Sequence, residues 1–513
     1  MKTIKKATSL LIAVLFIFTL FLTSGVSFVK AEDNVITVFS VEDYIHEAED
    51  DSELGVLDMF AEETGITVNY LTFATNEDMY NELSKDPYAC DLLCPSEYMI
   101  MKLMEEDMIR SFTTPYNFKE FGSPYIKEVF KGLKIGEGDN ARSFMSEDEN
   151  TSYAVGYMWG TVGLIYNMKP AKGGEITAED LSSWSNIWTK FTKKVTIKDS
   201  IRDSYFIALA YVYKDELLSA KKEYLNYGDT AKYKQTLTEI FNKTDKESVG
   251  KVEKALLDLK NNLYGFEVDA GKNDVLSGKI NVNVAWSGDA VCSIDEALFD
   301  LDGNLKDNPL YLGYAVPDEG SNIWFDGYVM TKNANYDNAL KFLDFIARPD
   351  VAVLNMDYTG YTSCIAGNQE NKEVFDYVVD SYHSDSDEGT EKYDLKYFFD
   401  PTHEGDDYVV NVEELYLSMF EAQYPTEEII NRCAVMQNFS GDDLERVNEM
   451  WKKVKLITLS TETIIFILVL AVILIVLVVV FKYREQVFEW LEKVLPKSKK
   501  KSNLKVIKVE KIR

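Results

Sequence analysis

The chain has 513 residues, which exceeds one ordinary domain and predicts at least two packed units. Hydrophobic residues make up 46% of the chain and aromatic residues 13%, so the composition excludes a disordered protein. The formal net charge of -31 at pH 7 repels nucleic acid and attracts cations, and we therefore expect no nucleic-acid partner.

The first residues predict export from the cytoplasm. Lysines at the start precede an apolar run over residues 10–22, and the small residues Val29 and Ala31 offer a cleavage site. This pattern is typical of a secretory signal peptide, which we place at residues 1–31.

Strand-like apolar runs alternate with helical patterns in the first part of the body. The expected strands are 35–41, 66–73 and 90–95, and the expected helices are 54–64, 76–85 and 98–109. Gly65 follows the first helix and is expected to end it. The alternation of strand and helix predicts a parallel sheet.

A second region of the same kind begins near Tyr153. It contains a strand through Ile197, a helix over 203–213 and a strand over 280–286. Between them, residues 214–262 are rich in Lys and Glu and predict solvated outer helices.

The C-terminal part predicts a membrane anchor. Residues 464–481 are eighteen consecutive apolar residues, from which we expect a transmembrane helix over 460–481. Lys482 and Arg484 follow at once, and the positive-inside rule places the basic tail, residues 482–513, in the cytoplasm. The predicted location is the cell membrane, with a single span and the acidic body outside the cell.

Short motifs in a fixed order run along the whole body. They are Asp43-Tyr44, Glu63-Thr64-Gly65-Ile66, Asn76-Glu77, Met79-Tyr80, Pro95-Ser96 with Tyr98, Trp159-Gly160, Ser183-Trp184 with Trp188, Lys198-Asp199-Ser200-Ile201-Arg202-Asp203, Ala285-Trp286-Ser287-Gly288, Trp324-Phe325-Asp326, Arg348-Pro349-Asp350-Val351 and Gly360-Tyr361. In this order they resemble the spermidine/putrescine-binding proteins of polyamine ABC transporters. Each motif alone is weak, and the resemblance rests on their order.

The resemblance implies an α/β, type II-like periplasmic-binding-protein fold with two lobes and a hinge, to which the chain adds its C-terminal transmembrane helix. One lobe would comprise residues 32–154 and 326–368, and the other residues 155–325 and 369–455. It also implies a polyamine ligand, no cofactor, no metal and no catalytic residue. The partners would be an ABC permease and a separate ATPase, because this sequence has no Gly-rich phosphate loop.

The resemblance also implies which residues bind the ligand. They are Tyr44, Ser96, Tyr98, Asp203, Trp286, Trp324, Asp326, Tyr361 and Gln437. A polyamine is a flexible apolar chain with a positive charge at each end, so carboxylates suit its ammonium groups and aromatic rings suit its methylenes. Hinge closure over the ligand is the implied mechanism.

Two segments depart from the family pattern. The first loop has Val41 and Glu42 where the family usually has a tryptophan and a threonine, and Ser200 stands where it often has an acid. Asp199 is adjacent to Ser200. These departures leave open the choice between a diamine and a triamine.

Three alternatives remain at this stage. The same fold could bind another small solute, although an anion site would favour arginines or helix N-termini in the cleft. An exported hydrolase is a second alternative, but the chain has only three histidines and lacks a Gly-x-Ser-x-Gly motif. A sensory ectodomain without a transport role is the third.

Overall fold

The computed structural model describes most of the body. The described residues are 34–48, 53–171, 174–386, 388–456, 469–470, 472–475, 478 and 481–482. The predicted signal peptide and the basic tail beyond residue 482 lie outside them. The chain divides into two units, Met1–Val454 and Lys455–Arg513, and the fold below is that of the first.

The predicted transmembrane helix over residues 460–481 is wrong. In the part of the chain that the structure describes, no helix is long and apolar enough to cross a membrane. Only eight residues of that range are described, and the others lie outside the described residues. The apolar run meets the composition that a span requires, but a span also requires about 20 residues in one continuous helix, and the described residues form no such helix.

The first lobe confirms the expected alternation of strands and helices. It contains β1 (Val35–Val41), α2 (Val56–Thr64), β2 (Thr67–Phe73), α3 (Asn76–Lys85), β3 (Leu92–Leu93) and α4 (Glu97–Glu105). β1 pairs in parallel with both β2 and β3. Gly65 ends α2 with a φ of 70°, in the left-handed region that favours glycine. The helix α4 ends before the predicted residue 109, because the chain turns at Asp107, where φ is 57°.

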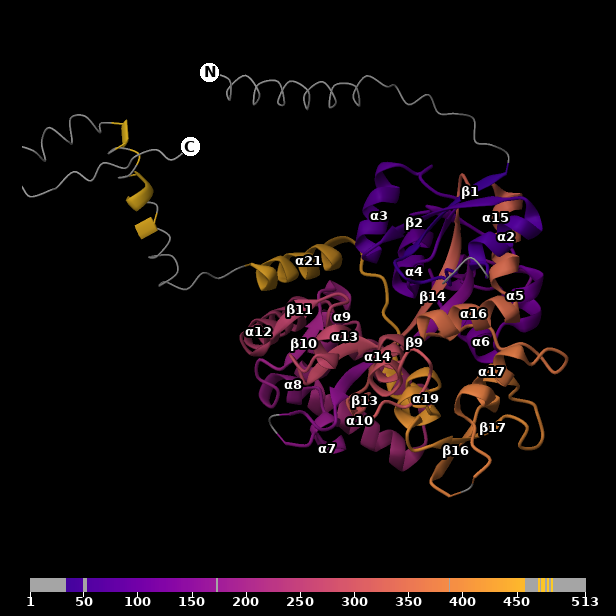
Figure 1. Cartoon of the computed structure of the whole chain (residues 1–513). Coiled ribbons are helices and arrows are strands. Elements are labelled where there is room, and N and C mark those ends of the chain that lie inside the picture. The colour runs from indigo at the N-terminus through magenta and orange to yellow at the C-terminus, as the bar shows by residue number, and fades with distance from the viewer. Residues whose placement is uncertain are drawn as a thin grey trace, which may run out of the picture. The chain divides into compact units, whose positions relative to one another are not determined.

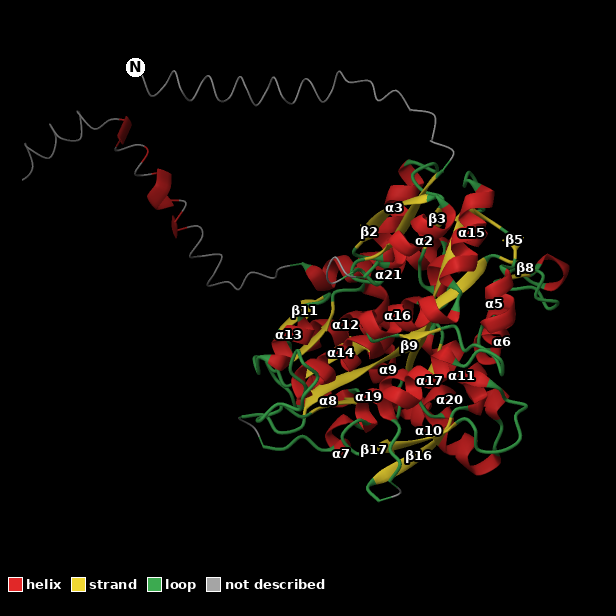
Figure 2. Ribbon diagram, turned by 45° about the vertical axis from the view of Figure 1, so that its right-hand side comes forward, coloured by secondary structure: helices red, strands yellow, loops and turns green. Residues whose placement is uncertain are grey.

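The second lobe repeats this arrangement. Its parallel strands are β10 (Val195–Lys198), β11 (Gly265–Glu267) and β12 (Val282–Trp286), and its helices include α9 (Ile201–Val212), α10 (Lys214–Tyr227), α11 (Thr230–Phe241), α12 (Lys246–Asn262), α13 (Gly271–Leu276) and α14 (Ser287–Leu298). Helix α9 begins where the Ser200 side chain accepts the Asp203 N–H. Helices surround the strands of both lobes (Figure 2).

Two long antiparallel strands connect the lobes, as Figure 1 shows. These are β9 (Ala154–Asn167) and β14 (Ser321–Thr331). β9 pairs with β14 over its first half and with β12 over its second half, whereas β14 continues to β3. The order β11-β10-β12-β9-β14-β3-β1-β2 therefore joins both lobes in one path. The family resemblance implied two lobes joined by crossing strands, but the sequence pattern did not locate them, because every residue of β14 is buried and no alternation of polar and apolar residues marks it.

The remaining larger elements complete the two lobes. They include α6 (Pro124–Gly132), α15 (Tyr336–Ile346), α16 (Pro349–Thr359), β15 (Thr362–Ser363), α17 (Glu373–Tyr382), β16 (Thr390–Asp394), β17 (Val409–Glu413), α19 (Leu417–Gln423), β18 (Cys433–Ala434) and α21 (Gly441–Lys455). Two of them, β15 and β18, extend the central sheet by pairing with β9 and β14. β16 and β17 form a two-stranded antiparallel sheet at the edge of the body (Figure 1).

Candidate ligand-binding site

A cavity of about 410 Å³ lies where the strand ends of the two lobes meet. Residues that follow β1, β2 and β3 line it on the first-lobe side, and residues that follow β10, β11 and β12 line it on the other. Ligands of open α/β sheets bind at the carboxyl ends of the strands, because side chains of several loops converge there. The carboxyl ends of the parallel strands of both lobes therefore face the same cavity.

Eight of the nine predicted ligand-binding residues line this cavity. They are Tyr44, Ser96, Tyr98, Asp203, Trp286, Trp324, Asp326 and Tyr361. Gln437 is not among the lining residues, although its neighbour Met436 is. The backbone of Gln437 accepts a hydrogen bond from Arg202 Nη2 at 2.7 Å and donates one to Asn242 Oδ1 at 2.8 Å.

Asp326 is a buried carboxylate on β14 that faces the cavity. Its Oδ2 accepts a hydrogen bond from the Tyr44 hydroxyl at 2.7 Å, and its Oδ1 has no hydrogen-bond partner among the described residues. Burial raises the pKa of Asp326 to about 6, although the Ser96 and Tyr44 hydroxyls counteract part of the rise. A buried acceptor without a partner is unfavourable, so a donor from a ligand would stabilise it.

Glu97 is a second buried carboxylate, which the sequence analysis missed. It is the first residue of α4, and its Oε2 accepts the Phe325 N–H at 3.0 Å. Its side chain is fully buried, and Oε1 has no hydrogen-bond partner within the described residues. Burial raises the pKa of Glu97 to about 8, and the nearby charge of Asp326 adds to the rise. An acid in the first turn of a helix usually only stabilises the helix dipole, so the sequence gave no signal of a site.

Three aromatic rings form a continuous wall beside Asp326. The rings of Tyr44 and Tyr361 meet edge to face with centroids 5.5 Å apart, and those of Trp324 and Tyr361 meet at 5.4 Å. The Trp324 Nε1–H has no hydrogen-bond partner among the described residues. The Tyr361 hydroxyl donates to Asp289 Oδ1 at 3.0 Å, so the wall ends at the second lobe.

Two of the aromatic rings that were predicted to bind the ligand contact cationic side chains of the protein itself. The Lys198 Nζ lies 4.0 Å from the centroid of the Trp286 ring, and the Arg202 guanidinium carbon lies 4.5 Å from that of Tyr98. One face of each ring is therefore occupied within the protein. Asp203 stands beside them in the first turn of α9, and burial raises its pKa.

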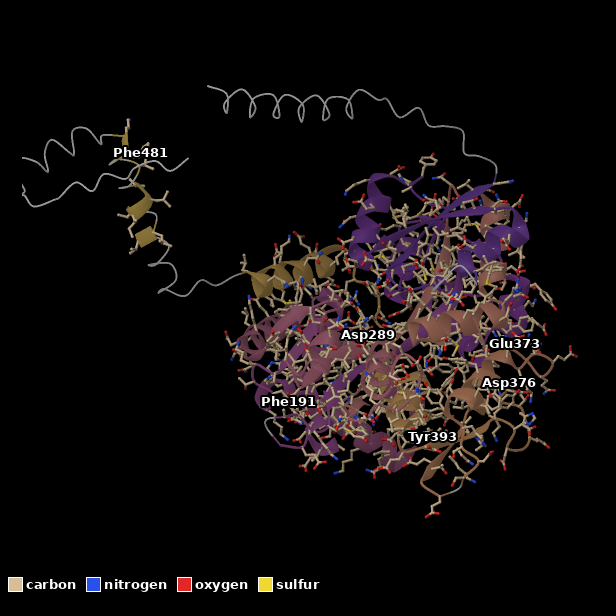
Figure 3. All side chains as sticks on the ribbon, viewed as in Figure 1. Phe191, Asp289, Glu373, Asp376, Tyr393 and Phe481 are labelled. Carbon is tan, nitrogen blue, oxygen red and sulfur yellow. The ribbon has the colours of Figure 1, made fainter. Side chains whose placement is uncertain are left out.

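Asp289 connects the cations of the second lobe. Its Oδ2 accepts a hydrogen bond from Lys198 Nζ at 3.1 Å, and its Oδ1 lies 3.6 Å from Lys272 Nζ. Burial acts to raise the pKa of Asp289, but the two ammonium groups hold it below its usual value. Figure 3 shows Asp289 near the middle of the body, whereas Asp376 lies toward its edge.

Comparison with known proteins identifies the family. The sequence model of the family described as bacterial extracellular solute-binding protein matches residues 55–378. The chain is 25% identical over 347 residues to the spermidine/putrescine-binding periplasmic protein of Escherichia coli K12, which covers 66% of this chain and 80% of that protein. It is 23% identical over 346 residues to a putrescine-binding periplasmic protein of the same bacterium, with the same shares covered.

Solved structures show the same two-lobed fold. A structure titled as a putative spermidine/putrescine ABC transporter from Listeria monocytogenes matches with a TM-score of 0.53 and 23% identity. A lipoprotein of Treponema pallidum matches with a TM-score of 0.54 and 17% identity. Each alignment covers 82% of this chain and 99% of the other. These similarities do not support the exported hydrolase considered above. The chain belongs to the family of bacterial extracellular solute-binding proteins, which are binding proteins and not enzymes.

Proposed function

We propose that the chain captures polyamines in this cavity and delivers them to an ABC permease whose ATPase is a separate chain. The observation that carries the proposal is the pair of buried carboxylates, Asp326 and Glu97, each with an oxygen that has no hydrogen-bond partner among the described residues. They lie beside a wall of aromatic rings. The names of the relatives, which include spermidine- and putrescine-binding proteins, support the same ligand class.

The chemistry of the cavity suits an alkyl diamine. A charge-assisted hydrogen bond from an ammonium group to a buried carboxylate contributes about 1.5 to 3 kcal/mol. A ring that contacts the cation contributes about 0.5 to 2 kcal/mol. Several such contacts reach micromolar affinity, which corresponds to about -8 kcal/mol, after the cost of ordering the ligand.

Delivery requires the two lobes to close on the ligand. We propose the lobe bounds 32–154 with 326–368 and 155–325 with 369–455, with β9 and β14 as the connecting strands that bend. Closure would form the surface that the permease recognises, and so couple binding to transport.

Calorimetry of the folded unit that ends at Val454 tests the ligand class. We expect putrescine or spermidine to bind with a Kd of about 1 μM or lower, and butylamine, which has one charge, to bind at least about tenfold more weakly.

Asp326→Asn should weaken polyamine binding by about tenfold or more, because the neutral amide cannot pair with an ammonium group. Asp376→Asn, on the exposed face of α17, is the matched control and should change nothing. Absence of binding by any polyamine would contradict the proposal.

A further inference from the structure

One ammonium group is already built into the cavity wall. Lys198 is the last residue of β10, and its side chain is only 1% exposed. Its Nζ donates to the Val268 carbonyl at 2.8 Å and to Asp289 Oδ2 at 3.1 Å. The same Nζ lies over the ring of Trp286, a residue that the family resemblance assigned to the ligand.

The second lobe holds this ammonium group in place by itself. β10 lies between β11 and β12, so the residues that follow those strands converge on the end of β10. Val268 follows β11, and Asp289 lies in the first turn of α14, directly after β12. A buried charge that loses its partners is strongly destabilising, so Lys198 is fixed by these contacts whether the lobes are open or closed.

The two ends of the cavity therefore differ in character. On the first-lobe side, Asp326 and Glu97 each carry an oxygen without a hydrogen-bond partner among the described residues. On the second-lobe side, Lys198 and Lys272 both reach Asp289, and Lys272 also pairs with Asp269 at 2.7 Å. Carboxylates therefore stand at both ends, but Asp289 and Asp269 are already paired with fixed ammonium groups, which repel a ligand cation that approaches closely.

We infer that Lys198 is a specificity-determining residue that occupies the Trp286 face as the protein's own cation and limits the ligand to a short diamine. This inference rests on the proposed function. A diamine places its ammonium groups on the carboxylates of Asp326, Glu97 and Asp203, which all line the cavity. A triamine such as spermidine carries a further ammonium group, which has to approach Lys198 and is repelled by it.

Calorimetry of the full chain and of one pair of variants tests this role. For the wild type we expect putrescine to bind about tenfold or more tightly than spermidine. Lys198→Met keeps most of the side-chain volume and removes the charge, so the preference for putrescine should fall by about tenfold. Lys279→Met is the control, because Lys279 pairs with Asp274 at 2.7 Å on the surface of the same lobe and does not line the cavity, and it should leave the preference within about twofold.

Two further arms keep the test decisive. Lys198→Arg keeps the charge and should retain the preference for putrescine, and the wild-type ratio stands even if Lys198→Met fails to fold. The amino acid 4-aminobutyrate has the length of putrescine but ends in a carboxylate, and we expect it to bind at least about tenfold more weakly than putrescine.

Each contrary result has a distinct meaning. Spermidine binding the wild type as tightly as putrescine, or an unchanged ratio in Lys198→Met, would overturn the role of Lys198 while leaving polyamine binding intact. Tighter binding of 4-aminobutyrate than of putrescine would show that the lysines bind an anionic group of the ligand, and it would also overturn the role of Lys198. If no amine binds at all, the proposed function itself fails.

Discussion

At the scale of single residues, burial keeps two carboxyl groups of the cavity partly protonated. Glu97 has its pKa raised to about 8 and Asp326 to about 6. The alkylammonium groups of a polyamine stay charged far above these values, as the ordinary pKa of lysine near 10.4 indicates. Ligand binding therefore favours the ionised carboxylates and releases protons at neutral pH.

Binding should consequently depend on pH. Polyamine affinity is expected to rise from pH 5 to pH 8, because Asp326 and then Glu97 become available as anions. Calorimetry at pH 7 in two buffers of different ionisation enthalpy measures the protons released. Glu97→Gln should release fewer protons than the wild type, and equal release by the two proteins would remove Glu97 from the site.

The Glu97 carboxyl group also makes the stability of the fold depend on pH, in the opposite direction to ligand affinity. Its folded-state pKa of about 8 lies above the usual value near 4.3, so the folded state keeps a proton that the unfolded chain loses. The stabilisation is complete below about pH 4 and disappears as the pH rises through about 8. Glu97→Gln should raise the free energy of unfolding at pH 9 by roughly 2 kcal/mol or more, since a tenfold change in protonation corresponds to about 1.4 kcal/mol.

Urea denaturation at pH 5 and pH 9 checks this expectation. The wild type should lose more stability between the two values than Glu97→Gln does. A loss of the same size in both proteins would show that another group carries the proton.

Sequence reasoning named many of the residues that line the cavity but not their neighbours. Asp326, Trp324 and Tyr361 could be placed because each stands in a motif of the family, in order. Glu97 could not, because it has an ordinary interpretation as a first-turn acid. Lys198 stands in a family motif, but the resemblance assigns only Asp203 of that motif to the ligand. Only the pairing of distant strands brings Val268 and Asp289 to Lys198, and such pairing leaves no local signal.

At the scale of elements, the cavity wall requires close packing between α14 and the segment after α16. A Cβ added to Gly288, in the first turn of α14, would lie 2.3 Å from the Tyr361 ring. Gly288→Ala should therefore displace that ring, lower the free energy of unfolding by about 1 to 3 kcal/mol and weaken ligand binding.

Gly250→Ala provides the matched control for this substitution. Gly250 lies within α12, and a Cβ added there meets no atom within 4 Å. Alanine at a compatible helical position stabilises by about 0.4 to 1 kcal/mol. Thermal or urea unfolding of both variants gives the comparison, and Gly288→Ala behaving like Gly250→Ala would contradict the packing described here.

The sequence predicted the elements of each lobe better than their connection. Hydrophobic runs and Gly65 located β1, α2 and β2 within one or two residues of their observed bounds. The sequence pattern did not locate β9 and β14, because both are buried almost throughout and so lack the alternation of polar and apolar residues that marks a half-buried strand. The register of the sheet shows which two strands cross between the lobes.

At the scale of the whole molecule, side-chain contacts join the two lobes across the cavity. The Tyr361 hydroxyl donates to Asp289 Oδ1 at 3.0 Å, and Tyr361 directly precedes β15, which pairs with the first half of β9. Asp289 belongs to α14 of the second lobe. This hydrogen bond therefore links the lobes across the cavity.

Removal of this hydroxyl tests the hinge. Tyr361→Phe keeps the ring and should weaken polyamine binding by about tenfold, because a hydrogen bond to a charged group contributes about 1.5 to 3 kcal/mol. Small-angle scattering should show a smaller ligand-induced decrease in the radius of gyration than in the wild type. Tyr377→Phe, which removes a 3.3 Å hydrogen bond to Asp357 away from the cavity, should match the wild type in both measurements.

The most direct test is a crystal structure of the protein grown with putrescine. We expect the diamine inside the cavity between the lobes, with one ammonium nitrogen within about 3 Å of an Asp326 carboxylate oxygen and its methylenes against Trp324 and Tyr361. Putrescine bound elsewhere, or bound in the cavity with Asp326 still lacking a partner for Oδ1, would contradict the account.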